Sequence, residues 1–353
     1  MGSDDAVFDS APSRTSLKEK VREFQSHTGS SSRQSSPPPA ASDNRRDRRD
    51  STDIPRVDPT TYFRLPDVMV CDTTDSLHAF SNDGTGSARS WQADIAGKAW
   101  YFIPASKMDY YGPGSQFVFG TFGDPHEPGP DKYAVKFRNP VTDADAAFQV
   151  QMDLKTEYNG GGQLKESSEL VMLYVWKQIK AENARHKVLV ILTDEAPWPI
   201  AEKRFADPLG IRTDGDVYTS DIIKGLKKAG WEIFVILKPY GEETSFSSYY
   251  SSRIYEAWRQ YLPANRIIRL RDSTRVTDIN LAIAATVTGR VDYFYEDLLA
   301  KQHDPTGRLE IEKIVPVYEA LRDVHGVEVQ ERHPYPGMKM SGLGEGQPSE
   351  SLL

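Results

Sequence analysis

The sequence predicts a Rossmann-like, doubly wound α/β fold, in which a mostly parallel sheet carries helices on both faces. Two observations predict it. Short continuous apolar runs, such as 188–192 and 231–237, have the pattern of buried parallel strands. These runs alternate with longer segments whose apolar residues recur at helical spacing, for example 166–182. Strands that alternate with helices in this way are typical of a parallel sheet covered on both sides.

The N-terminal half of the expected fold begins with the apolar run at 67–71, which we interpret as the first strand. A polar loop follows at 81–89, and a helix-like segment covers 91–106. The Phe-Val-Phe run in 116–121, flanked by glycine, predicts the second strand. Alternating apolar and polar residues at 132–137 predict a hairpin partner for it.

The C-terminal half repeats the same alternation. Helices are expected where apolar residues fall on one face, and a glycine at 230 is a normal stop for the helix before it. Strands are expected at the short apolar runs between them. The expected helices are 143–154, 166–182, 221–229, 249–261 and 277–288, and the expected strands are 188–192, 231–237 and 266–270.

The domain organisation is expected to be one folded unit with two tails. Residues 1–58 are rich in serine, proline and arginine, and they contain too little apolar surface to offset chain entropy. We therefore predict a disordered N-terminal tail, in which 16–25 is interpreted as a transient helix, with a short partner-docking helix as the less favoured alternative. The folded α/β domain is predicted at 59–330. A flexible C-terminal tail is predicted at 331–353, which contains prolines and several glycines.

Composition excludes several classes of protein. The chain has 353 residues with 43 basic and 51 acidic side chains, a net charge of −8, which argues against a general nucleic-acid binder. The single cysteine, Cys71, cannot form an internal disulfide or a cysteine-rich metal site. No apolar stretch approaches the roughly 20 residues of a membrane span, and no secretory leader is evident. A cytoplasmic protein is expected.

Two apolar runs end abruptly in an aspartate. The run at 68–71 ends in Asp72, with hydroxyl groups following at alternate positions, Thr74 and Ser76. The run at 188–192 is followed by a threonine and Asp194. Because ligands of open α/β sheets bind at the carboxyl ends of the strands, we predict that these side chains meet there. Such a set offers only oxygen atoms, which hard cations such as Mg²⁺ prefer.

With these two loops the sequence resembles the von Willebrand factor type A family, whose metal-ion-dependent adhesion site begins with an Asp-x-Ser/Thr-x-Ser motif. The segment 72–76 (Asp-Thr-Thr-Asp-Ser) is similar to that motif, and 192–194 (Leu-Thr-Asp) is similar to a later loop of the family. The segment 119–124 resembles the second strand of one branch, and 160–166 resembles its glycine-rich loop. All four occur in the family's order over about residues 66–290.

The resemblance implies a divalent cation, Mg²⁺ or Mn²⁺, bound by Asp72, Thr74, Ser76 and Asp194 directly or through water. It also implies one departure from the family. The glycine-rich loop of the family supplies a threonine or aspartate, and Gln163 stands at that position here. Its amide oxygen can serve as a neutral ligand. Upstream oxygen donors, Thr156 and Glu157, are less favoured substitutes.

Other candidate sites are weaker. His126 lies among glycine and proline residues between Asp124 and Glu127, which we interpret as an ordinary exposed turn rather than a metal or acid–base site. The glycine run at 160–162 lacks the Gly-Lys-Ser/Thr ending of a phosphate-binding loop. Trp198 follows the second aspartate loop, and we expect it at the rim of the site, where an aromatic ring favours partner binding.

The functional prediction is a non-enzymatic, intracellular protein-binding module. A metal held at the predicted site would leave a coordination position for an exposed Asp or Glu of a protein partner, with no nucleic acid and no membrane span involved. Two alternatives stay open. One is a Mg²⁺-dependent hydrolase of the phosphoesterase type that uses the same strand-end carboxylates. The other is a metal-free scaffold with the same fold. The sequence indicates neither the partner nor the oligomeric state.

Overall fold

The central feature of the computed structural model is a six-stranded sheet in the order β12-β11-β7-β2-β3-β4. The structure describes residues 68–86, 89–126, 132–154, 164–241, 243 and 245–326. In the central sheet β4 runs antiparallel to β3, and all the other pairs are parallel. The strands are β2 (Ser76–Asp83), β3 (Gln116–Phe122), β4 (Val135–Phe137), β7 (His186–Thr193), β11 (Trp231–Leu237) and β12 (Ile267–Arg269).

Numbered along the chain, these six strands have the spatial order 3-2-1-4-5-6 of doubly wound folds. The prediction of a doubly wound, mostly parallel α/β fold is therefore confirmed. The order reverses between β2 and β7, which are paired in register from Ser76 opposite His186 to Asn82 opposite Leu192. The carboxyl ends of these two strands form the switch point at which such folds bind ligands.

The first central strand is not where the sequence predicted it. Of the expected strand at 67–71, the structure forms the two-residue β1 (Met69–Val70), which pairs with β6 (Ile179–Lys180) outside the central sheet. The central strand is instead β2, all eight residues of which are buried. Five of the eight residues in its sequence, Ser-Leu-His-Ala-Phe-Ser-Asn-Asp, are polar, so it lacks the continuous apolar run of a buried strand.

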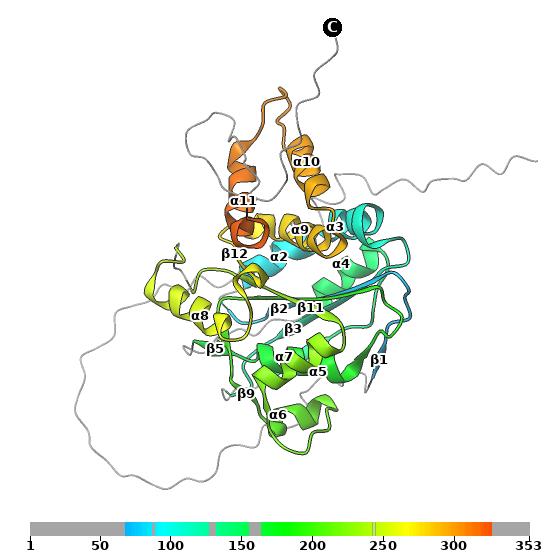
Figure 1. The fold of residues 1–353 in the computed structure, drawn as a ribbon, viewed down its shortest axis with the longest axis vertical. Helices are drawn as coiled ribbons and strands as arrows, with labels where there is room; N and C mark the ends of the chain where they lie inside the picture. Colours follow the sequence, from blue (N-terminus) through cyan, green and yellow to red (C-terminus); the bar gives the residue numbers. More distant parts are fainter. Residues whose placement is uncertain are drawn as a thin grey trace, which may run out of the picture. The chain divides into compact units, whose positions relative to one another are not determined.

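Helices cover both faces of the sheet (Figure 1). On one face, side chains such as Ala79 and Leu189 pack with α5 (Ser168–Gln178), α7 (Thr219–Lys228) and α8 (Tyr249–Arg259). On the other, alternate side chains such as Phe80 and Val190 face a second set of helices. That set is α2 (Arg89–Gly97), α3 (Ala99–Ala105), α4 (Ala144–Asp153), α9 (Val276–Thr288), α10 (Val291–Lys301) and α11 (Ile311–His325). The last two helices were not expected.

Short elements connect these layers. The expected helix at 91–106 is divided into α2 and α3, and a π-helical turn, η2 (Ser106–Tyr111), extends it. Paired two-residue strands fasten the loops at the carboxyl edge of the sheet. The remaining elements are β5 (Lys165–Glu166), β8 (Ala196–Pro197), β9 (Ile200–Ala201), α6 (Lys203–Ala206), η3 (Asp207–Leu209), β10 (Val217–Tyr218), η4 (Ala264–Arg266) and η5 (Ser273–Arg275).

Several expectations lie outside the described residues: both tails, 1–58 and 331–353, and the glycine-rich loop that contains Thr156, Glu157 and Gln163. The domain boundaries at 58 and 330 stay predictions. Among the residues that are described, none of the helices combines the length and the apolar character needed to cross a membrane.

Candidate functional site

The structure separates the predicted metal ligands. Ser76 begins β2 and lies opposite His186 at the amino edge of the sheet, whereas Asp194 directly follows the other end of β7. Eight residues at ~3.3 Å per residue place the two ends of β2 roughly 23 Å apart. Asp72 and Thr74 precede Ser76 and are exposed. The prediction that these three share an ion with Asp194 is therefore corrected, because the strand was assigned about ten residues too early.

The 72–76 segment has a structural role instead. The Thr73 hydroxyl donates to the Gly114 carbonyl at 2.9 Å, and the Gly114 amide donates to Asp75 Oδ2 at 2.7 Å. The Ser76 hydroxyl donates to the carbonyl of Tyr111 at 3.3 Å. These hydrogen bonds tie the start of β2 to the loop that precedes β3.

A second copy of the Asp-x-Thr-x-Ser spacing lies at the correct end of the strand. Asp83 is the last residue of β2 and is followed by Gly-Thr-Gly-Ser, with Thr85 within the described residues and Ser87 outside them. Extending the pairing of Asn82 with Leu192 puts Asp83 beside the loop that carries Asp194. The sequence contains this signal, but the polar residues of β2 before it do not predict a strand, so 81–89 has the pattern of a polar loop.

The glycine of this motif is required by close packing. A Cβ atom at Gly84 would overlap the Tyr133 hydroxyl and the Thr121 hydroxyl, and it would touch the carbonyl of Phe122. The Gly84 amide donates to that same carbonyl at 2.7 Å. The turn after Asp83 therefore lies directly against β3. Only a residue without a side chain at position 84 allows this close contact.

Two buried carboxyl groups meet at this edge. Asp83 Oδ1 accepts a 2.7 Å hydrogen bond from the Thr85 amide. Asp83 Oδ2 and Glu166 Oε2 are buried and receive no hydrogen bond from any other described group. Burial raises the pKa of Asp83 to about 7 and the charge of Asp194 adds to the rise, while a hydrogen bond shared with Glu166 offsets part of it. Burial, and then Asp83, raise the pKa of Glu166 well above its ordinary value.

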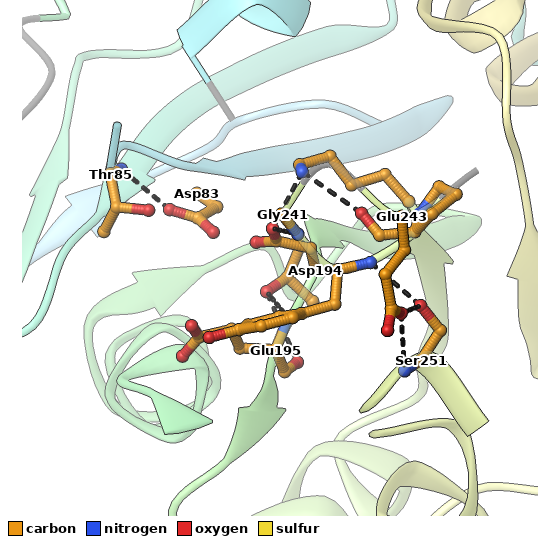
Figure 2. Close-up of polar contacts among 11 residues, drawn as sticks. Asp83, Thr85, Asp194, Glu195, Gly241, Glu243 and Ser251 are labelled. Carbon is orange, nitrogen blue, oxygen red and sulfur yellow. Dashed lines mark hydrogen bonds and ion pairs between the residues drawn. The ribbon is translucent and has the colours of Figure 1, made fainter. Parts of the chain in front are cut away.

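Asp194 has a cationic partner that the sequence reasoning missed. Lys238, the residue after β11, donates from Nζ to Asp194 Oδ2 at 2.7 Å, and the two side chains are 3% and 0% exposed. The Gly241 amide donates to the same oxygen at 3.1 Å (Figure 2). Lys238 also follows an apolar strand directly, so the rule that singled out Asp194 would have found it.

The loops that carry these groups are held firmly. Parallel pairing of β5 with β8 links the Glu166 segment to the Asp194 loop, and the Ala196 amide donates to the Leu164 carbonyl at 3.1 Å. Buried Trp258 donates from its indole nitrogen to the Glu195 carbonyl at 2.9 Å. Such support keeps the carboxylates in place before any ligand arrives.

The loop after β11, which also contacts Asp194, is fixed to α8 by hydrogen bonds to Ser251. Ser251 donates from its hydroxyl and its amide to Glu243 Oε2, at 2.5 and 3.1 Å, and its hydroxyl accepts from the Tyr240 amide at 2.9 Å (Figure 2). Burial raises the pKa of the Tyr240 hydroxyl, followed by the charges of Glu195 and Asp194. The tyrosine therefore belongs to the same electrostatic environment as the carboxylates.

His126 is not the exposed turn residue that the sequence suggested. Its ring lies 3.1 Å from Asp124 Oδ1 and 3.2 Å from Glu202 Oε1, and its side chain is 12% exposed. Trp198 packs on it with ring centroids 4.3 Å apart. Residues 125 and 126 do form a turn, but the histidine links the end of β3 to the loop before α6. Trp198 is half buried beside it.

The donor set fits a hard cation in its chemistry. In the part of the chain that the structure describes, no three His, Cys, Asp or Glu side chains are grouped around one point. An adhesion-type site, however, needs only a carboxylate or two with hydroxyl and water oxygens, and Mg²⁺ retains several waters. Asp83 and Glu166 bring two oxygens that have no outside donor, and Thr85 and Asp194 lie beside them. A cation there would replace the proton that the pair must otherwise share.

Comparison with known proteins identifies no family. No family model matches the chain, and no curated protein matches it. Among solved structures, the pilus adhesin SpaC from Lactobacillus rhamnosus GG is 11% identical, with 65% of this chain and 32% of that chain covered and a TM-score of 0.41. Proximal thread matrix protein 1 from the mussel byssus, in a form with a zinc-occupied MIDAS motif, is 12% identical over 61% and 46% of the two chains, with a TM-score of 0.39.

The chain spans less than half the length of both proteins. At these scores the similarity carries no argument about the site. The chemistry assigned to the carboxyl edge therefore depends on the described residues alone.

Proposed function

We propose that this chain is a protein-binding module that uses a divalent cation at the carboxyl edge of its sheet. Asp83, Thr85 and Asp194 would hold the ion, with Glu166 beside them. The observation that supports this most strongly is the buried pair of carboxyl oxygens on Asp83 and Glu166, which have no outside donor at the topological switch point. Uncompensated buried charge is costly, so a cation at this place stabilises the folded state.

The binding chemistry follows from the composition of the site. The Thr85 hydroxyl supplies a neutral contact, and a bound Mg²⁺ or Mn²⁺ keeps some positions for water. A carboxylate of a partner protein can replace such a water. We therefore propose an exposed Asp or Glu of a protein as the ligand, with no nucleic acid involved, and a cytoplasmic setting as the sequence suggested. Under this proposal the module has no catalytic activity.

The first test measures the ion by itself. Thermal unfolding of the wild-type chain would be followed with EDTA and with increasing Mg²⁺ or Mn²⁺, because a ligand of the native state must raise its stability. We expect a saturable rise for the wild type. Asp83→Asn should lose it, whereas Asp72→Asn, a change at an exposed aspartate at the opposite edge, should keep it. A wild-type chain that neither cation stabilises would contradict the proposal.

The second test concerns the partner. Affinity capture would be run with and without EDTA, using the wild type, Asp83→Asn and Asp72→Asn. The proposal expects a partner that is retained by the wild type and Asp72→Asn in Mg²⁺ and lost with EDTA or Asp83→Asn. Retention that is indifferent to chelation and to Asp83→Asn would refute metal-mediated recognition even if a metal binds.

One observation favours a second function. Hydrolysis of a phosphoester on a metal needs charge neutralisation and several polar groups around the ion. Lys238 lies in contact with Asp194, and the charge of Asp194 acts on both Asp83 and Glu166, so a cationic side chain accompanies the carboxylates of this edge. Turnover of p-nitrophenyl phosphate with and without Mg²⁺ separates the two functions. Activity that is lost in both Lys238→Met and Asp83→Asn would favour the hydrolase.

A further inference from the structure

A cavity of about 680 Å³ lies at the opposite edge of the sheet, against the amino ends of β2 and β7. Asp75 and His186 line it from the strand side, the π-helical turn η2 forms a second wall, and Arg290 after α9 forms a third. Its volume is within the range of small-molecule sites, about 300–1,000 Å³. The cavity shares no residue with the proposed metal site.

The charge of the cavity is opposite to that of the whole chain. Lys107, Arg185 and Arg290 line it against one carboxylate, Asp75, a formal balance of three positive charges to one negative. The chain as a whole carries a net charge of −8. Asp75 also accepts the amide hydrogen of Gly114, so its charge is partly engaged by the wall itself.

The three cations have no acidic partner in the described residues. Lys107 donates to the carbonyl of Thr142 at 3.0 Å, and Arg290 donates to the carbonyl of Asp109. Arg185 has no side-chain hydrogen bond or ion pair within that part of the chain, and its charge, after burial, lowers the pKa of neighbouring His186. Their positive charge is therefore available to an anion from outside.

Other parts of the cavity wall present apolar side chains. Tyr110, Tyr111 and Pro104 contribute apolar surface, and Met108 is 82% exposed. Lys107, Met108 and the two tyrosines all come from η2, and π-helical turns are rare and occur frequently at functional sites. The hydrogen bonds of the 72–76 segment hold the loop that follows η2. This segment, which the sequence predicted as part of the metal site, therefore helps to form the cavity.

A second cavity provides a contrast. It has a volume of about 420 Å³ near the end of β12 and also contains arginines. There Arg269 is paired with Asp323 at 2.9 Å, and Asp272 and Glu319 share the wall. Its positive charge is largely compensated, unlike that of the first cavity.

From the unpaired cations and the apolar wall, we infer that the cavity at the amino edge binds a small organic phosphate of mononucleotide size. Two net positive charges match a phosphate dianion. Arginine guanidinium groups suit phosphate oxygens because their donors form a planar fork. The tyrosines and Met108 supply contact for the organic part. The bounded volume favours a small molecule over an extended chain.

The test is calorimetric titration of the full chain with AMP and, separately, with inorganic phosphate at low salt. EDTA is present throughout, so phosphate cannot bind through an ion at the other edge. We expect saturable binding with AMP tighter than inorganic phosphate. Arg185→Ala should weaken AMP binding about tenfold or more, because a charge-assisted hydrogen bond is lost. Arg290→Ala should act in the same direction.

Arg212→Ala is the matched control, since Arg212 is an exposed arginine that does not line this cavity. It should bind AMP as the wild type does. All three arginines are exposed, so thermal unfolding should show the variants to be folded. The inference is overturned if AMP does not bind saturably, if AMP and inorganic phosphate bind equally, or if Arg185→Ala and Arg290→Ala both leave AMP binding unchanged.

Discussion

The ion pair of Lys238 with Asp194 allows a prediction that separates stability from metal binding. In Lys238→Met the ammonium group is removed and the length of the side chain is nearly kept. Both partners are almost fully buried, 3% and 0% exposed, with a 2.7 Å contact. Removing one partner of such a pair costs about 3–5 kcal/mol, because the buried Asp194 carboxylate loses its contact with the ammonium group. The Gly241 amide also donates to Asp194, but a neutral amide does not replace the charge of the ammonium group.

The same substitution should strengthen metal binding. Lys238 is a positive charge in contact with a carboxylate of the proposed site, so it repels a divalent cation and competes for Asp194. In the variant, the ion becomes the compensating charge. At a concentration 100 times its dissociation constant, a ligand raises the free energy of unfolding by about 2.7 kcal/mol. Mg²⁺ should therefore recover much of the lost stability in the variant.

The assay is urea unfolding of wild type and Lys238→Met, each in EDTA and in Mg²⁺. The double variant Lys238→Met/Asp194→Asn is the control, because it removes both charges and should be more stable than Lys238→Met in EDTA. A loss below about 1 kcal/mol in EDTA would refute the assignment of a buried ion pair. An equal gain from Mg²⁺ in both proteins would refute the competition between lysine and metal.

Three further predictions concern the fold. Burial lowers the pKa of His78 to about 3 from an unfolded value of 6.5, so the unfolded state takes up a proton first as the pH falls. The free energy of unfolding should drop by about 2 kcal/mol between pH 7 and pH 5, and His78→Asn should flatten that dependence in urea titrations. Gly120→Ala places a Cβ against an aromatic ring and a carbonyl of β4 and should lower the melting temperature, whereas Gly215→Ala, in open space, should not. Trp258→Phe removes the bond to Glu195 and should cost about 1 kcal/mol or more in chemical unfolding.

The elements that the sequence predicted correctly are those whose burial is visible locally. The apolar run at 188–192 lies within β7, and 231–237 matches β11 in full. Amphipathic spacing likewise located α7 and α8. In each case the side chains that face the core are apolar, so burial and residue type agree.

In the first central strand, β2, burial and residue type do not agree, and the reason is physical. His78 is buried because it bonds to the Tyr111 hydroxyl at 3.0 Å and to Asn280 Oδ1 at 3.1 Å, and Asn280 lies 202 residues away in the chain. A polar side chain can occupy a buried strand only when such partners exist. No local pattern shows them, so the sequence predicts the strand at the apolar run 68–71 instead.

Local sequence patterns predict the doubly wound class, the order of most elements and the place of Asp194 at a strand end. Those features depend on periodicity and on short-range turn chemistry. The tertiary structure decided which aspartate joins Asp194, because the register of β2 against β7 brings Asp83 and not Asp72 to that edge. It also brought Lys238 to Asp194 and gathered Arg185 and Arg290 around one cavity. These contacts arise between segments far apart in the chain, where pairing and charge rather than local pattern determine the neighbours.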